Sequence, residues 1–195
     1  MFLNIEQQLK EFDYIFFLNA NMLPVAPIGD EILPTKEQGL IVTIHPGAYQ
    51  RDRAGFSYET NPASTAFIPA EQGEYYFMGG FNGGLAKPAL QSYHDMLNNI
   101  QKDLQKGIIA VWHDESHLNK YVLDKNPLIL LPEYGYPEGW ILPAPIKPKM
   151  MILDKTKPKY GGHDYLRGIT NKKRGYIRHY LGRCKAKFAA LMKRK

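Results

Sequence analysis

The densest group of reactive side chains lies in residues 112–121, where two adjacent acids stand between two histidines. A carboxylate such as that of Glu115 can attack the anomeric carbon of a sugar or stabilise the positive charge that develops there. A second carboxylate, here that of Asp114, can hold or deprotonate a hydroxyl group. Because neighbouring residues of an extended chain point to opposite sides, we expect each acid to face a different substrate.

Two other interpretations of residues 112–121 stay open at this point. Asp114 can cap a helix whose first turn carries both acids, and this interpretation is compatible with the catalytic one. His113 and His117 are four residues apart and can share a helix face. However, the helix of a zinc protease has Glu directly after its first His, and no third ligand for zinc is evident. A zinc site is therefore disfavoured.

A pair of asparagines, Asn19 and Asn21, follows the apolar run of residues 14–18. Polar residues at the carboxyl end of a buried strand are where open α/β sheets bind ligands. Amide oxygens are weaker ligands for a hard cation than carboxylates are, whereas amide N–H groups can donate hydrogen bonds to phosphate or to sugar hydroxyls. An ordinary turn explains the same spacing, because asparagine is common in turns.

Glycines and basic residues mark two further candidate ligand segments. Residues 75–84 contain two glycine pairs, which let the backbone approach a ligand closely but equally fit a sharp turn from strand to helix. Residues 155–167 carry Lys155 and Arg167 on either side of another glycine pair. Where no metal neutralises a diphosphate, Lys and Arg must supply the charge, and such a segment can close as a lid. A solvated basic loop is the alternative.

The elements that must position these residues alternate between strands and helices, which predicts an α/β fold. We expect helices at residues 2–12, 87–106 and 116–123, and strands at residues 14–18, 40–44, 75–78, 108–111 and 128–131. The first strand is a continuous apolar run, typical of a strand buried on both faces of a parallel sheet. One helix and one strand precede Asn19, whereas a nucleotide-binding half needs a strand-helix-strand unit there. We therefore expect the chain to begin partway through a domain.

The length and amino-acid composition limit the kinds of protein to which this chain can belong. The 195 residues suit one domain, at residues 1–170, with its own hydrophobic core. The lone Cys184 excludes an internal disulfide and fits a reducing compartment. The sequence has neither an apolar run long enough to span a bilayer nor the pattern of a signal peptide. We therefore expect a cytoplasmic protein.

The C-terminal residues 171–195 carry the positive charge of the chain. They hold ten Lys and Arg and no acid, with apolar residues at helical spacing, while the chain as a whole has a net charge of +6. This pattern predicts a basic amphipathic helix or tail that is solvated or lies peripherally on the inner face of an anionic membrane. Nucleic acid is not an expected partner, because no nucleic-acid-binding module accompanies the charge.

Four segments, in this order, resemble those of glycosyltransferase family six, which includes the histo-blood-group A and B transferases and the α-1,3-galactosyltransferases. The segments are Tyr14–Met22, His45–Tyr49, Tyr75–Gly84 and Trp112–Tyr121, and the last of them is the most specific. The resemblance implies a GT-A fold whose first strands are missing from this sequence. It also implies retaining transfer from a UDP-sugar to the 3-hydroxyl of galactose.

The resemblance assigns roles to individual residues. Glu115 matches the candidate nucleophile of the family, so the resemblance implies that it is catalytic. The implied donor-binding residues are Asn19, Asn21, Met78, Gly79, Gly80, Asp114, Lys155 and Arg167, and the implied acceptor-binding residues are His45, Ser57 and Trp112.

The resemblance also implies the substrates. Met78 and Gly80 match the positions that choose between galactose and N-acetylgalactosamine, and Gly80 and Gly47 both match the A-type transferase. The implied donor is UDP-GalNAc, and the implied acceptor is a fucosylated galactoside. Asn19 and Asn21 stand in place of metal-binding aspartates, as in bacterial-type members that work without metal, so no metal or other cofactor is expected. The alternatives are transfer from UDP-Gal and an inactive fragment that binds glycan or nucleotide sugar.

Overall fold

The computed structural model describes residues 2–143, 145–173, 175 and 181. The chain divides into two compact units, Met1–Ile152 and Leu153–Lys195, each of which is described by itself. The helices of the first unit are α1 (Glu6–Leu9), α2 (Ala86–Gln105) and α3 (Asp114–Tyr121), with short 3₁₀ helices at Phe2–Ile5, Asp30–Ile32, Arg53–Gly55 and Pro132–Gly135. Its strands are β1 (Tyr14–Leu18), β2 (Met22–Pro24), β3 (Leu40–Ile44), β4 (Phe77–Leu85), β5 (Leu128–Leu130), β6 (Tyr136–Pro137) and β7 (Met150–Ile152).

These strands form two mixed sheets. The larger sheet has the order β1-β4-β3-β5, in which β4 runs antiparallel to both β1 and β3, and β5 runs parallel to β3. The smaller sheet has the order β2-β7-β6. The predicted α/β class is confirmed, and so are the predicted strands near residues 14–18, 40–44 and 128–131 and the long helix that became α2.

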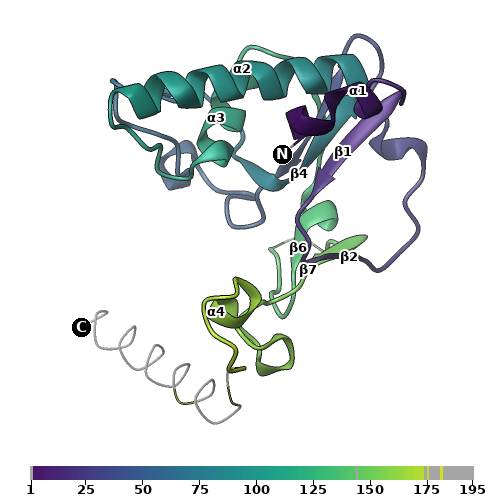
Figure 1. The fold of residues 1–195 in the computed structure, drawn as a ribbon. Helices are drawn as coiled ribbons and strands as arrows, with labels where there is room; N and C mark the ends of the chain where they lie inside the picture. The colour runs from purple at the N-terminus through teal and green to yellow at the C-terminus, as the bar shows by residue number, and fades with distance from the viewer. Residues whose placement is uncertain (1, 144, 174, 176–180, 182–195) are drawn as a thin grey trace. The chain divides into compact units, whose positions relative to one another are not determined.

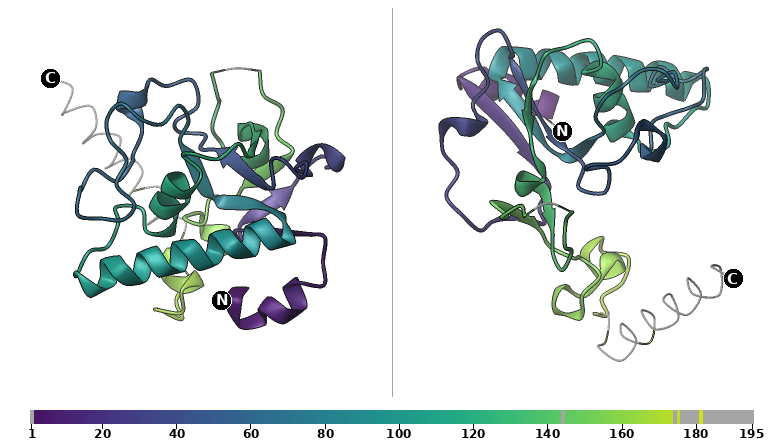
Figure 2. Two further views of the ribbon diagram at one scale, coloured as in Figure 1. Left: turned by 90° about the horizontal axis from the view of Figure 1, so that it is seen from above. Right: turned by 180° about the vertical axis from the view of Figure 1, so that it is seen from behind.

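Strand β3 lies inside the larger sheet and is buried along its whole length. Because side chains alternate between the faces of a strand, Leu40 packs with Leu90 of α2, and Val42 packs with Leu118 of α3. Ile41 belongs to a separate cluster on the other face. Figure 1 shows α2 lying across one face of the larger sheet. Figure 2 shows the same arrangement from above and from behind.

Strand β1 is not the expected strand buried on both faces of a parallel sheet. Among the described strands, it pairs with β4 alone, in antiparallel orientation, at the edge of the larger sheet. Ile15 is buried, but Leu18 is 39% exposed. A short apolar run predicts a strand but does not distinguish a central strand from an edge strand with one covered face.

A sharp turn from strand to helix, one of the two interpretations of the glycine-rich residues 79–84, is wrong, because β4 continues through them to Leu85. A Cβ atom at Gly83 would lie 2.2 Å from the carbonyl oxygen of Ile15, so glycine here lets β4 approach β1. The expected strand at residues 108–111 is wrong, because that segment is irregular. Sequence reasoning missed β2 and its partner β7. For β2, the reason is Pro24 at its end, because a proline argues against a strand.

The second unit contains a 3₁₀ helix at Pro158–Tyr160 and the short helix α4 (His163–Leu166). Lys155 and Arg167 belong to this unit. The predicted amphipathic helix at residues 171–195 lies outside the described residues, apart from residues 171–173, 175 and 181. In the part of the chain that the structure describes, no helix combines the length and apolar character needed to cross a bilayer.

Candidate active site

A bulge in β4 shapes the site. On β3, the adjacent residues Val42 and Thr43 pair with Asn82 and Met78 of β4, so residues 79–81 leave the regular ladder. The two glycines in this segment suit such a distortion. Because a bulge disrupts the regular backbone ladder, the peptide groups of residues 79–81 also bond to side chains and to the chain after β1.

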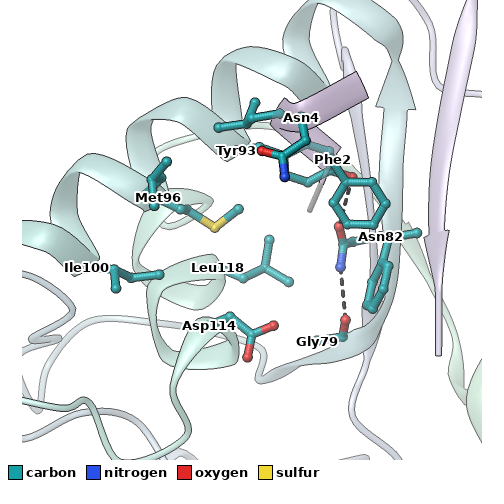
Figure 3. A pocket seen from close by; sticks show the side chains of 12 residues that line it. Phe2, Asn4, Gly79, Asn82, Tyr93, Met96, Ile100, Asp114 and Leu118 are labelled. Carbon is teal, nitrogen blue, oxygen red and sulfur yellow. Dashed lines mark hydrogen bonds between the residues drawn. The ribbon is translucent and has the colours of Figure 1, made fainter. Parts of the chain in front are cut away.

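Two predicted site residues hold the bulge. The Gly79 N–H donates to Glu115 Oε2 at 2.7 Å, and the Gly79 carbonyl accepts from Asn82 Nδ2 at 3.0 Å, a bond drawn in Figure 3. The Gly80 carbonyl accepts from the Asn19 backbone N–H at 2.9 Å. The residue that follows β1 and the first turn of α3 are therefore both hydrogen-bonded to this bulge.

Both oxygens of the Glu115 carboxylate accept a hydrogen bond. Oε1 accepts from the Tyr76 hydroxyl at 2.6 Å, and Oε2 accepts from the Gly79 N–H. Burial, together with the hydrogen bond to Glu115, raises the pKa of Tyr76, so its phenol stays protonated and remains a donor at neutral pH. Two donors from β4 and the residue before it fix the orientation of the carboxylate, and each oxygen keeps lone-pair capacity for a further contact.

Helix α3 begins directly at the two acids. Asp114 and Glu115 lie in its first turn, but the Asp114 side chain is not the cap, because the residue before the helix is His113 and no side chain caps it. His113 has a φ angle of 52°, which is uncommon for a residue other than glycine and typical of functional sites. This conformation turns the chain sharply between Trp112 and the acids.

One buried side chain ties α3 to β4. Asn119 Oδ1 accepts from the Phe77 N–H at 2.8 Å, and Asn119 Nδ2 donates to the carbonyls of Phe77 and Glu115 at 2.8 and 2.9 Å. Only 2% of Asn119 is exposed. The amide therefore sets the position of α3, and with it Glu115, relative to the strand that carries Gly79. Sequence reasoning missed Asn119, because its partner lies 42 residues away along the chain.

Glu115 lines a cavity of about 380 Å³, called the Glu115 cavity below. The predicted acceptor-binding residues His45, Ser57 and Trp112 line the same cavity, as does Tyr76. Trp112 is 51% exposed, so its ring is available as an apolar wall for a ligand. The structure thus brings the predicted catalytic residue and the three predicted acceptor-binding residues together.

His45 is neutral in this cavity. Burial lowers the pKa of His45, and Arg51 lowers it further, against the opposing effect of the Glu115 charge. Its Nδ1 accepts from the Gly47 N–H at 3.0 Å, which places the proton of the neutral ring on Nε2. A Cβ atom at Gly47 would lie 3.0 Å from the ring, so glycine leaves room for this geometry. His45 can therefore donate one hydrogen bond to a ligand hydroxyl.

Asp114 faces a different cavity, of about 480 Å³, called the Asp114 cavity below. Figure 3 shows Asp114 and Gly79 on one side of it and the α2 residues Met96 and Ile100 on another. Its walls are mostly apolar, with Asp114 and Asn82 among the few polar groups. Such a combination is typical of ligand sites. The two adjacent acids thus line two different cavities.

The other predicted donor-binding residues of the first unit lie at the turn after β1. The Met22 N–H donates to the Asn19 carbonyl at 2.9 Å, so Asn19–Met22 is a turn, and Asn21 is half-buried in it. A Cβ atom at Gly80 would lie 2.9 Å from Asn19 Nδ2 and 2.7 Å from Met78 Cε. Met78 is a core residue that is only 4% exposed, and its terminal methyl reaches Gly80.

Two buried carboxylates that sequence reasoning missed hold the loops before α3. Glu59 Oε2 accepts from the Val111 N–H at 2.7 Å. Asp103, at the end of α2, is 1% exposed and accepts from Ser64 Oγ at 2.6 Å. Although burial alone would raise the pKa of Asp103, the hydrogen bonds that it accepts from Ser64 and Thr65 hold it below its ordinary value. Fixing Val111 also restrains the neighbouring Trp112 at the Glu115 cavity.

The residues at the turn after β1 do not fit a divalent metal well. Asn19 and Asn21 offer neutral amide groups, whereas hard cations prefer carboxylates. Within the described residues, no group of three or more His, Cys, Asp or Glu side chains is placed to hold a metal ion. His113 and His117 do not converge, since one is exposed and the other buried.

The chain is similar to proteins of a known family. A family model described as glycosyltransferase family 6 matches residues 3–160. The chain is 40% identical over 140 residues to histo-blood group ABO system transferase 2 of Rattus norvegicus, which covers 69% of this chain and 41% of that protein. It is 33% identical over 148 residues to globoside alpha-1,3-N-acetylgalactosaminyltransferase 1 of Homo sapiens, covering 75% of this chain and 42% of that protein. The chain therefore spans about two fifths of the length of these relatives.

Proposed function

We propose, from the premise that this chain belongs to glycosyltransferase family 6, that it transfers N-acetylgalactosamine from UDP-GalNAc to the 3-hydroxyl of galactose in a fucosylated glycan. The new linkage is α-1,3, and the configuration at the anomeric carbon is retained. The observation that carries this proposal is the placement of Glu115. Both its oxygens are fixed by donors from the β4 segment, and its side chain lines a cavity with His45, Ser57 and Trp112.

Retention follows from two displacements at the same carbon. In the first, a Glu115 oxygen forms a bond to the anomeric carbon as the bond from that carbon to UDP breaks. In the second, the acceptor oxygen bonds to the anomeric carbon, the bond to Glu115 breaks, and the hydroxyl proton passes to a phosphate oxygen of the UDP released in the first displacement. His45 can hold the acceptor through its Nε2 proton, and Asp114 can hold donor hydroxyls from its own cavity.

The choice of N-acetylgalactosamine rests on the small residue at position 80 and on the names of the relatives. The human relative is a globoside N-acetylgalactosaminyltransferase. In this chain, Gly80 is buried beside the Asn19 amide and the Met78 methyl. The absence of a side chain at this position favours a donor with an N-acetyl group, because the group would meet no Cβ there.

We expect transfer from UDP-GalNAc to proceed undiminished in the presence of EDTA. The reason is that Asn19 and Asn21 supply amides in place of carboxylates, which hard cations prefer. The family resemblance assigns the charge that a diphosphate needs to Lys155 and Arg167 instead of to a metal. The measurement is the initial rate with a fucosylated galactoside, with and without EDTA and with added Mn²⁺. A rate that vanishes in EDTA and returns with Mn²⁺ would contradict the metal-independent part.

Changing Gly80 to alanine is expected to shift donor preference from UDP-GalNAc towards UDP-Gal by roughly 10-fold, the range for small steric changes in a pocket. The new Cβ would displace the Met78 methyl and the Asn19 amide, and both movements take space from the N-acetyl group. The ratio of kcat/KM for the two donors measures the effect. Gly107→Ala is a matched control, because a Cβ at Gly107 would meet no atom within 4 Å, although its φ of 70° adds some backbone strain. An unchanged donor ratio in Gly80→Ala argues against a role of Gly80 in the choice of donor.

A second candidate function is binding of glycan or nucleotide sugar without transfer. The observation that favours it is that Asp114 and Glu115 line two different cavities, each of which can hold a ligand by itself. It predicts saturable binding of UDP-GalNAc or of the acceptor, seen by calorimetry, with no product at high protein concentration. Product formation with either UDP-GalNAc or UDP-Gal decides against it.

A further inference from the structure

Arg51 gives the Glu115 cavity a positive charge that the proposed reaction does not use. Arg51 and Glu115 are the two charged side chains among the described residues that line this cavity. No hydrogen bond or ion pair joins the Arg51 guanidinium to any other side chain or carbonyl in the described part of the chain. Arg51 is an exposed residue, and its side chain is therefore open to a ligand.

Arg53, the second arginine of the same loop, differs from Arg51 because its guanidinium is hydrogen-bonded. Arg53 donates from Nε to the Gln72 carbonyl at 2.6 Å and from a terminal nitrogen to the Pro69 carbonyl at 3.0 Å. Its guanidinium also lies 4.3 Å from the centre of the Tyr58 ring. Arg53 thus holds the loop together, whereas Arg51 has no such role.

The backbone around Arg51 is arranged to present this side chain. Gln50 has a φ angle of 56°, an uncommon conformation for a residue with a side chain. A Cβ atom at Gly55 would lie 3.4 Å from Arg51 Cδ, so the arginine stem runs over this glycine. The stem is therefore supported beside the cavity that Arg51 lines.

The charge of Arg51 acts on a residue that lines the cavity, because it contributes to lowering the pKa of His45. An arginine presents two parallel N–H donors that match a carboxylate or a phosphate group. The neighbouring polar groups, the Ser57 hydroxyl and the His45 ring, suit sugar hydroxyls. Together these residues can recognise a sugar that carries an anionic group close to the reacting galactose.

We propose that Arg51 selects acceptors that carry an anionic group, a carboxylate or a phosphate, next to the galactose that receives the new sugar. This inference rests on the proposed function and adds the chemical class of the acceptor. The anionic group forms a two-pronged hydrogen bond with the guanidinium, while the galactose lies between Trp112, His45 and Glu115. The reactions that supply such an acceptor are those that attach an acidic sugar or a phosphate to a growing glycan.

The test compares two acceptors that differ in a single group: a fucosylated galactoside linked to glucose, and the same compound linked to glucuronate. The expected result is that kcat/KM is roughly 10-fold higher for the acidic acceptor, as for a charge-assisted hydrogen bond at a partly exposed site. Arg51→Gln removes this preference, so that the variant has similar kcat/KM values for the two acceptors, and Arg51→Lys keeps part of the preference. A phosphate-bearing acceptor in place of the glucuronate distinguishes the two kinds of anion.

Two outcomes overturn the proposal. One is an equal loss with both acceptors in Arg51→Gln, which would mean that Arg51 shapes the loop. The other is a higher KM for UDP-GalNAc with an unchanged acceptor ratio, which would place Arg51 on the donor diphosphate. The dissociation constants of the two acceptors, measured by calorimetry without donor, give the same ratio independently of transfer. Absence of all transfer would therefore contradict the proposed function, while the binding ratio still decides the role of Arg51.

Discussion

Replacement of Glu115 by glutamine is expected to lower kcat by at least about 10³-fold, with little change in KM, because an amide cannot attack the anomeric carbon. Glutamine can keep the geometry. Its oxygen accepts from the Gly79 N–H, and its NH₂ donates to the Tyr76 hydroxyl, which can reverse its role from donor to acceptor. The loss of rate then reports the loss of the carboxylate itself.

The measurement is steady-state kinetics of transfer with both substrates, beside thermal unfolding of the two proteins. Tyr76→Phe is a graded control, because it removes one donor to Glu115 and leaves the carboxylate in place. We expect a loss of roughly 10-fold in kcat for that variant, which corresponds to about 1.5 kcal/mol for one hydrogen bond to a charged group. A kcat near that of the unchanged protein in Glu115→Gln would remove Glu115 from the chemistry.

Replacement of Asn119 by aspartate is expected to cost about 3–5 kcal/mol of the free energy of unfolding, as for a buried charge without a partner. The shape of the side chain hardly changes. However, two N–H donors are lost, and the carbonyls of Phe77 and Glu115 then face a carboxylate oxygen where the amide now bonds them. The carboxylate would also be buried, since 2% of Asn119 is exposed.

Chemical denaturation measures this effect, and Asn98→Asp is its matched control. Asn98 lies on α2 and is exposed, so the same change of chemistry there should alter the free energy of unfolding by less than about 0.5 kcal/mol. The variant at Asn119 should also lose transfer activity below its unfolding temperature, because Glu115 and Gly79 are no longer held together. Equal stability of the two aspartate variants would show that the Asn119 hydrogen bonds do not matter.

Local sequence patterns predicted the parts of this fold that local physics decides. The apolar stripe and the glycine stop of α2, and the apolar run of β3, are sufficient to place those elements. The bulge was not predictable, because it depends on which residues of β3 stand opposite Asn82 and Met78. The irregular segment at residues 108–111 is likewise decided by a distant group, the Glu59 carboxylate that binds the Val111 N–H.

The sequence predicted the reactive residues of the candidate site, but it did not predict the residues that hold them in position. The reactive residues Asp114 and Glu115 were recognisable by type and spacing, and the structure separates them into two cavities. Tyr76 and Asn119, which hold Glu115, carry no local signal, because a tyrosine near a strand or an asparagine in a helix usually has an ordinary role. Their function depends on hydrogen bonds between residues 39 and 42 positions apart.

The bulge in β4 also limits how this protein can vary. Its carbonyls are taken up by Asn82, by the Asn19 N–H and by the Thr43 hydroxyl. Removing one residue between Met78 and Asn82 would move every later side chain of β4 to the opposite face of the sheet. The segment can therefore accept a new residue type, as at Gly80, far more readily than a deletion or an insertion.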